Sequence, residues 1–235
     1  ALAIRDAAEE NAHAFKTPIA VIAQSLEPLR HSLAPADARG RRAVEMIDRS
    51  VARLDELVGA TRRIDQAIAL SVDPPRQRLD LSTLVGQLVE DYRDAALLRQ
   101  VSIALVCKPG IIVLAGEDLL ESVVENLLDN AIDFSPPQGV IEVRVESVGR
   151  RVLLSVSDQG PGVSAEQLPR LFTRYYTQRP QTSDGGHGNS GLGLWIVKRS
   201  IESIGGTVAV ENRAQGGFSV KIDLPLAPVE RGRNS

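Results

Sequence analysis

Four short segments of this sequence contain residue types that could do chemistry, and the first surrounds His13 in AHAFKTPIAVI. His13 lies off the apolar stripe of Ala8, Ala12 and Phe15, about 160° from Phe15 on a helical wheel, and should face solvent. Pro18 has no N–H and should bend the helix nearby. An exposed imidazole with an ordinary pKa of about 6.5 offers a neutral nucleophilic nitrogen at pH 7. Taken alone, such a histidine is more often simply solvated.

The second segment is ESVVENLLDNAIDFSP, residues 121–136, which has helical periodicity. Asn126, Asn130 and Asp133 fall within about 60° of one another beside its apolar face. With Asp129 close by, these side chains form an oxygen-rich edge of the kind that suits Mg²⁺ bound with a nucleotide. An ordinary polar flank is the alternative for this helix alone.

The third segment is VLLSVSDQGPG, residues 152–162, whose alternation is typical of a strand. Asp158 ends an inward-facing row, and the row also contains Val152, Leu154 and Val156. A buried carboxylate needs hydrogen-bond donors, and the amino group of a ligand could be one. Gly160 and Gly162 would let the loop pass close to a flat ligand. A plain turn after a strand is the alternative.

The fourth segment is GGHGNSGLGLWIVKRSI, residues 185–201, where glycines lead into an amphipathic helix. Backbone N–H groups and the positive end of a helix dipole form an anion site at such a position. The segment fits neither a dinucleotide fingerprint nor a phosphate loop, since it lacks a lysine-serine pair and a strand directly before it. Residues 163–190 have few apolar anchors and indicate a mobile flap over a ligand.

The first third of the chain must position His13. Apolar residues at steps of three and four predict one helix over residues 1–33 and a second over 44–68, joined by a break at 33–40. The second helix carries a heptad seam, which a single hairpin would leave without a partner. Two hairpins paired into a four-helix bundle would bury it, so we expect a homodimer. Packing of the hairpin on its own chain is the alternative.

The other three segments belong to a mixed α/β region that follows Pro74 and Pro75, where the helix must end. The patterns there predict helices at 81–98, 117–134 and about 191–204. They predict strands at 101–106, 111–115, 140–147, 151–158, 207–212 and 218–226. Helices with an antiparallel-looking sheet indicate a two-layer α/β sandwich.

Composition excludes several functions. The formal net charge is −3, with 27 basic and 30 acidic residues, so we expect no nucleic-acid partner. Cys107 is the only cysteine, which excludes an intrachain disulfide and a cysteine metal cluster. No run approaches the roughly 18 apolar residues of a membrane span, so we expect no membrane contact by this fragment. The abrupt opening in a helical pattern suggests that an upstream sensory or membrane part is missing.

Together the segments resemble the motifs of sensor histidine kinases of two-component systems, in the same order and over essentially the whole chain. HAFKTP resembles the phosphoacceptor box, ENLLDNAIDFSP the N box and DQGPG the G1 box. LPRLFTRYY resembles the F box, GNSGLGLWIVK the G2 box and GGFSVKIDLP the final glycine-strand element.

The resemblance implies an α+β multidomain protein with an N-terminal antiparallel helical hairpin that forms a dimeric four-helix bundle. It implies a dimerisation and histidine phosphotransfer hairpin at 1–72 and a linker at 73–79. An ATP-binding domain of the Bergerat (GHKL) type would follow at 80–228, and a disordered tail at 229–235. The cofactors would be ATP and Mg²⁺. The partners would be a second copy and the receiver domain of a response regulator. The chain would be the cytoplasmic part of an inner-membrane receptor.

Residue roles carry over by match. His13 would be the phosphoacceptor, and Thr17 matches the threonine tied to phosphatase activity. Asn130 would bind Mg²⁺ and Asn126 would lie near the phosphates as a catalytic residue. The remaining expected ligand contacts are Asp158 with the adenine amino group, Phe134, Gly160 and Gly162 around the base, and Gly191, Leu192 and Gly193 with the phosphates. Phe172 would anchor the flap.

Three positions depart from the family pattern: Ala14 replaces an acid, Asp133 replaces a base, and Thr177 replaces an arginine. They leave open a kinase-impaired dimeric phosphatase or scaffold that binds the regulator. A plain ATPase of the gyrase and Hsp90 type is disfavoured by the exposed His13, and by Asn126 where such enzymes carry a glutamate base. The sequence does not reveal the signal, the regulator or whether phosphorylation occurs within or between protomers.

Overall fold

A computed structural model describes residues 76–174, 176 and 191–228, together with isolated helical positions between 22 and 51. His13, Thr17 and most of the expected hairpin lie outside the described residues. The four-helix bundle, the dimer and the domain boundaries therefore remain predictions. Within the described part of the chain, no helix is both long and apolar enough to cross a membrane.

The centre of the described region is a five-stranded sheet in the order β2-β4-β5-β7-β6. Its strands are β2 Ser102–Cys107, β4 Val140–Val148, β5 Arg151–Ser157, β6 Thr207–Asn212 and β7 Phe218–Pro225. All neighbouring pairs are antiparallel except β2 with β4, which is parallel. The expectation of an antiparallel sheet is therefore wrong for this pair. The reason is the long helix between the two strands, which returns the chain to the end where β2 began.

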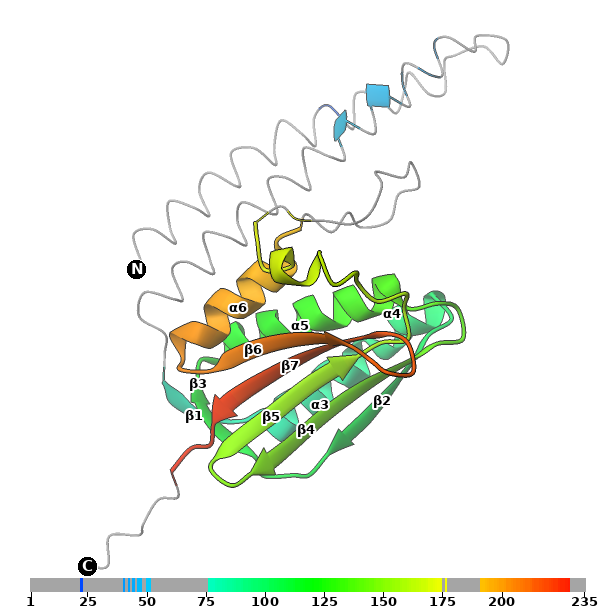
Figure 1. Cartoon of the computed structure of the whole chain (residues 1–235). Helices are drawn as coiled ribbons and strands as arrows, with labels where there is room; N and C mark the ends of the chain where they lie inside the picture. Colours follow the sequence, from blue (N-terminus) through cyan, green and yellow to red (C-terminus); the bar gives the residue numbers. More distant parts are fainter. Residues whose placement is uncertain are drawn as a thin grey trace, which may run out of the picture.

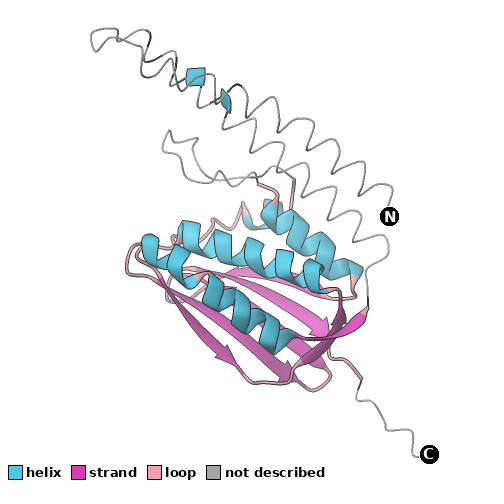
Figure 2. Cartoon of the chain, turned by 180° about the vertical axis from the view of Figure 1, so that it is seen from behind, coloured by secondary structure: helices cyan, strands magenta, loops and turns pink. Residues whose placement is uncertain are grey.

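The α-helices of the described region from residue 76 onward lie together on one face of the sheet, as Figure 1 and the reverse view in Figure 2 show. They are α3 Leu81–Asp91, α4 Arg93–Leu98, α5 Glu117–Phe134 and α6 Gly193–Ser203. The expected helix over 81–98 is thus two helices that meet at Tyr92, whereas 117–134 is confirmed. The arrangement confirms a two-layer α/β sandwich, with its apolar core between helices and sheet.

A second, two-stranded sheet joins β1, Gln77–Asp80, to β3, Ile112–Ala115. The sequence reading placed residues 77–79 in a linker and missed this strand, because its four residues include a single apolar side chain, Leu79. Asp80 then caps α3, since its carboxylate accepts a hydrogen bond of 3.1 Å from the backbone N–H of Thr83. The chain is therefore fixed to the sandwich from β1 onward.

Candidate functional site

Helix α5 supplies one wall of the site, and its apolar periodicity explains which way that wall faces. Its fully buried residues include Leu120, Val123, Val124 and Leu127, which pack in the core. With this face packed in the core, Asn130 and Phe134, further along the helix, lie at the edge of a cavity. The helix thus presents a carboxamide and an aromatic ring side by side.

Strand β5 and the residue after it supply one end of the cavity. Val152, Leu154 and Val156 are buried, as the alternation predicts, and Asp158 directly after the strand is only 5 % exposed. Its carboxylate oxygen Oδ1 accepts hydrogen bonds from the backbone N–H groups of Gly160 at 2.7 Å and Phe218 at 3.2 Å. These contacts satisfy one carboxylate oxygen and hold the loop after β5 against β7.

The charge of Asp158 is set by opposing effects. Burial raises the pKa of its carboxyl above the usual range, while the two backbone donors and the guanidinium of Arg213 pull that pKa down. Burial is the largest of these effects, so the net pKa is raised. A buried carboxylate in this setting gains from a ligand that donates a further hydrogen bond.

The start of α6 supplies the opposite end. The helix begins at Gly193 without a hydrogen bond from a capping side chain, so its N-terminal dipole faces the cavity uncapped. A Cβ atom at Gly193 would lie 3.0 Å from Oδ1 of Asn126 and 3.3 Å from Nδ2 of Asn130. The helix start therefore packs directly on both asparagine side chains, and glycine allows that approach.

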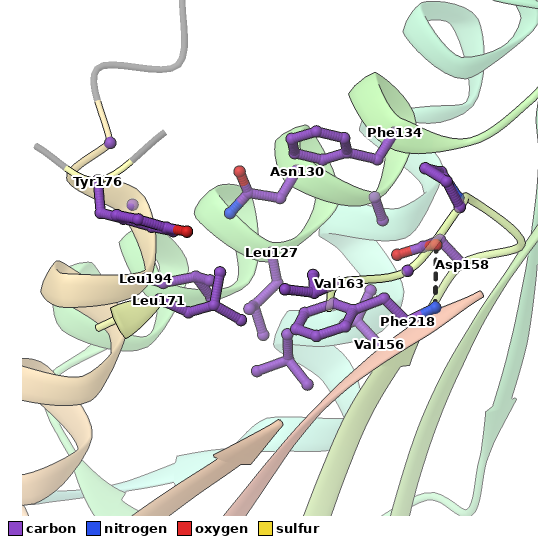
Figure 3. Close-up of a pocket in the computed structure, with 16 residues that line it drawn as sticks. Leu127, Asn130, Phe134, Val156, Asp158, Val163, Leu171, Tyr176, Leu194 and Phe218 are labelled. Atoms are coloured by element: carbon purple, nitrogen blue, oxygen red, sulfur yellow. Dashed lines mark hydrogen bonds between the residues drawn. The ribbon is translucent and has the colours of Figure 1, made fainter. Parts of the chain in front are cut away.

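These walls enclose a cavity of about 240 Å³. Figure 3 shows Asn130 and Phe134 on one side, Val156 and Phe218 on the other, and Asp158 and Tyr176 at opposite ends. The described lining residues are Leu127, Asn130, Ala131, Phe134, Val156, Asp158, Pro161, Gly162, Val163, Leu171, Tyr176, Gly191, Gly193, Leu194, Phe218 and Val220. The cavity is a mostly apolar slot with a hydrogen-bond acceptor at one end and an anion-binding helix start towards the other. This suits a flat, amino-bearing heterocycle joined to an anionic group.

Most of the ligand-binding residues expected from the sequence meet in this one place. Asn130, Phe134, Asp158, Gly162, Gly191 and Gly193 all line the cavity. Gly160 contributes through its hydrogen bond to Asp158, and Asn126 through its contact with Gly193. Leu192 differs, because its side chain is fully buried rather than in the described lining, which leaves only its backbone for a ligand.

The first part of the expected flap is attached to α6 by ring contacts. The guanidinium of Arg174 lies 4.2 Å from the ring centre of Trp195, and Nζ of Lys198 lies 5.1 Å from that of Phe172. Phe172 thus contacts α6, as expected of an anchor. Residues 177–190 lie outside the described part of the chain.

No lysine or arginine is among the described residues that line the cavity. Asp133 instead forms an ion pair with Arg99, with 3.8 Å between Oδ1 and Nη2, and its side chain is 12 % exposed. Lys198 lies against Phe172 and pairs with Glu202 at 3.9 Å. The described walls therefore leave the charge of an anionic ligand to the start of α6 and to groups outside the described range.

Sequence reasoning missed several residues of the site. Leu171 and Tyr176 of the F-box segment and Phe218 of the last strand line the cavity, although none of the three was expected to contact the ligand. Behind the site, the hydroxyl groups of Ser157 and Ser219 lie 2.8 Å apart and are buried. The two serines come together through the β5–β7 pairing, which a single sequence does not reveal.

The chain is similar to known proteins over this region and beyond. Residues 115–228 match the family of histidine kinase-, DNA gyrase B- and HSP90-like ATPases. The sensor protein ChvG of Rhizobium meliloti is 32 % identical over 239 residues, which is 96 % of this chain and 41 % of that protein. The sensor protein kinase PmrB of Pseudomonas aeruginosa is 32 % identical over 217 residues, covering 91 % and 44 %.

Solved structures agree with these similarities. The mycobacterial sensor histidine kinase MprB is 28 % identical with a TM-score of 0.57, covering 66 % of this chain and 99 % of that one. Full-length ShkA in complex with AMPPNP is 26 % identical with a TM-score of 0.68, covering 95 % and 46 %. The chain spans about two fifths of the length of the curated relatives it matches. This chain belongs to the sensor histidine kinases of two-component systems, and its ATP-binding domain is of the GHKL type.

Proposed function

We propose that this chain is the catalytic core of a sensor histidine kinase that uses ATP to phosphorylate His13 and then passes the phosphate to an aspartate of a response regulator. The observation that carries the proposal is the cavity with Asp158 at one end and Asn130 and the start of α6 further along. We also propose that it removes the phosphate from the regulator, with Thr17 taking part.

The cavity chemistry supports a defined orientation for ATP. The adenine ring would lie between Phe134 and the sheet, with its exocyclic amino group donating to the Asp158 carboxylate. The phosphates would then extend towards Asn130, Gly191 and Gly193, where the uncapped helix start favours negative charge. The flat, apolar middle of the slot suits the base, and each end suits the group placed there.

Mg²⁺ fits the donor set at the phosphate end. Asn130 lines the cavity and Asn126 lies beside it, so carboxamide oxygens are at hand. The described residues contain no group of three or more histidine, cysteine or acidic side chains that would form a protein cage. That matches the preference of Mg²⁺ for phosphate oxygens and water with one or two protein ligands. When bound, the ion would neutralise charge on the phosphates.

Transfer of the γ-phosphoryl group from ATP to His13 is a substitution at phosphorus. An imidazole nitrogen of His13 forms a bond to the γ-phosphorus while the bond from that phosphorus to the β–γ bridging oxygen breaks. ADP leaves with the electron pair, and the proton of the imidazole goes to water or to Glu10, which precedes His13 by three residues in the sequence. Ala14 offers no acid for this step. The receiver aspartate then takes the phosphoryl group from the phosphohistidine.

Labelling with [γ-³²P]ATP and Mg²⁺ tests the proposal. The parent should gain label that is lost in acid and kept in alkali, and His13→Gln should gain none. His31→Gln and His187→Gln are matched controls, because they remove the other two histidines of the chain. Label on His13→Gln, or its loss only in a control variant, would contradict the assignment.

A second function is favoured by specific residues. Ala14 stands where the family pattern has an acid beside His13. Asp133 stands where that pattern has a basic residue, and it forms an ion pair with Arg99. These features support a dimeric phosphatase or scaffold with impaired kinase activity. Nucleotide binding without labelling, together with Thr17-dependent dephosphorylation of a phosphorylated receiver domain, would favour this function over the first.

The assembly is also a proposal. We propose that residues 1–72 form the dimerisation hairpin, that the linker expected at 73–79 ends before β1, which belongs to the ATP-binding domain, and that 229–235 form a tail. The heptad seam supports the dimer. We further propose that the chain acts in the cytoplasm as part of a longer membrane receptor, which the greater length of its relatives supports. Light scattering at several concentrations would measure the oligomeric state.

A further inference from the structure

The turn between β6 and β7 holds the loop that carries Asp158, although the turn itself has no established part in the site. Asn212 is the last residue of β6, and its carboxamide makes two hydrogen bonds to the backbone of Val163. Its Oδ1 accepts from the Val163 N–H at 2.8 Å and its Nδ2 donates to the Val163 carbonyl at 2.5 Å. The Asn212 side chain therefore pairs with both backbone groups of Val163, at the C-terminal end of the loop, as a neighbouring strand would.

Arg213 holds the near end of the same loop. Its Nη1 donates to the carbonyl oxygen of Asp158 at 3.2 Å. Its backbone N–H donates to the carbonyl of Gly217 at 2.9 Å, which closes the turn and fixes where the side chain starts. The guanidinium is therefore anchored beside the carboxyl group of Asp158.

The strand after the turn completes the contact. Backbone N–H groups of Phe218 and Asp158 donate in both directions: Phe218 to Oδ1 of Asp158, and Asp158 to the Phe218 carbonyl. Gly217 has a φ of +103°, and a Cβ there would overlap the carbonyl oxygen of Asp158. The turn and the loop are thus in direct backbone contact.

We propose that Asn212 and Arg213 are positioning residues for nucleotide binding: through their hydrogen bonds to Val163 and Asp158 they hold the Asp158–Val163 loop in its binding conformation. The inference rests on the proposed function of the cavity. Neither residue is among the described residues that line it, so both act through Asp158 and the loop rather than on the ligand.

Electrostatics gives the two residues separable effects. Arg213 is the charged side chain that acts on Asp158, alongside the N–H groups of Gly160 and Phe218. It opposes the rise in the carboxyl pKa that burial causes, so its removal should raise that pKa further. Asn212 is uncharged, so replacing its side chain should loosen the loop and leave the pKa of the Asp158 carboxyl unchanged.

Titration of AMPPNP·Mg²⁺ binding against pH separates these effects. Arg213→Gln should weaken binding at neutral pH and move the acid limb of the binding profile to higher pH. Arg213→Lys, which keeps the positive charge, should return the acid limb of the binding profile most of the way to its position in the parent. Asn212→Ala should weaken binding by about fivefold to thirtyfold at all pH values, with no shift of the limb.

A matched control lies in the same two strands. Lys221→Gln breaks an exposed ion pair of 2.6 Å with Glu211 and touches neither the loop nor the cavity. It should leave the binding constant and the pH profile unchanged. Thermal melts of all variants show whether each one is folded at the assay temperature.

Carboxyl ¹³C NMR of Asp158 without nucleotide provides the second measurement. A higher midpoint in Arg213→Gln than in the parent and Lys221→Gln is expected. If the parent binds AMPPNP while the folded Arg213→Gln variant keeps its affinity, its acid limb and its Asp158 midpoint, the inference alone is overturned. If the parent itself fails to bind, the proposed function is overturned and the inference with it.

Discussion

Replacement of Asp158 by asparagine should separate ligand binding from folding. The substitution keeps the size and shape of the side chain and removes its charge. Asp158 is 5 % exposed, and its Oδ1 accepts from Gly160 and Phe218 at 2.7 and 3.2 Å. An asparagine oxygen can take the same two N–H groups, so the loop after β5 should keep its conformation.

The expected loss of nucleotide affinity follows from the hydrogen bond that the carboxylate would accept. A hydrogen bond to a charged group contributes about 1.5–3 kcal/mol. Its loss weakens binding by about tenfold to 150-fold at pH 7. The loss should be smaller at acid pH, because the parent carboxylate is then itself protonated.

Folding stability should move in the opposite direction. The folded pKa of Asp158 is raised above its ordinary 3.8, so the folded state binds the proton more tightly than the unfolded state. The resulting stabilisation is fully present below the unfolded pKa and is lost as pH rises through the folded pKa. At pH 7 the ionised parent should therefore be no more stable than Asp158→Asn, and the parent should gain relative to the variant as pH falls.

Isothermal titration with AMPPNP·Mg²⁺ and urea unfolding at pH 5 to 8 would measure both quantities. Asp223→Asn is the matched control, because Asp223 pairs with Arg151 at the far end of β7, outside the described cavity lining. The reasoning would be refuted by an Asp158→Asn variant that binds nucleotide as tightly as the parent. It would also be refuted by one that is several kcal/mol less stable at pH 7.

Three further outcomes are expected. Gly193→Ala should reduce nucleotide affinity, because the new Cβ would lie within 3.3 Å of the Asn126 and Asn130 side chains. The melting temperature should change little, because alanine favours the helix. Calorimetry would measure both the affinity and the melting temperature. Arg174→Ala should shift the emission of Trp195, the only tryptophan, to longer wavelength, since the guanidinium 4.2 Å from its ring is replaced by water. Ala14→Glu should raise the initial rate of His13 labelling by supplying a proton acceptor, and an unchanged rate would count against that role.

Local patterns were enough to predict much of the sandwich and of its site. The bounds of α5 follow from the spacing of its apolar residues and match Glu117–Phe134. Alternation along β5 places Asp158 on the buried side, where the structure has it. In both cases the information lies within one element, because burial of one face of a helix or strand is set by its own periodicity.

The remainder depends on contacts between distant parts of the chain. The parallel pairing of β2 with β4 and the short strand β1 follow from how elements pack, and QRLD alone carries no strand signal. Asn212 ends the strand predicted at 207–212 and Arg213 follows it, yet both contact a loop about 50 residues earlier in the chain, with Asn212 49 residues from Val163. A single sequence cannot give such pairings, since hydrogen bonds across elements leave no periodic trace.

The most direct test of the account joins the cavity to His13 in one experiment. Acid-labile ³²P incorporation from [γ-³²P]ATP would be measured against ATP concentration for the parent, His13→Gln, Asp158→Asn and Asp223→Asn. His13→Gln should carry no label, Asp158→Asn should need an at least tenfold higher ATP concentration for half-saturation, and Asp223→Asn should behave like the parent. Label on His13→Gln, or an Asp158→Asn curve that overlies the parent curve, would contradict it.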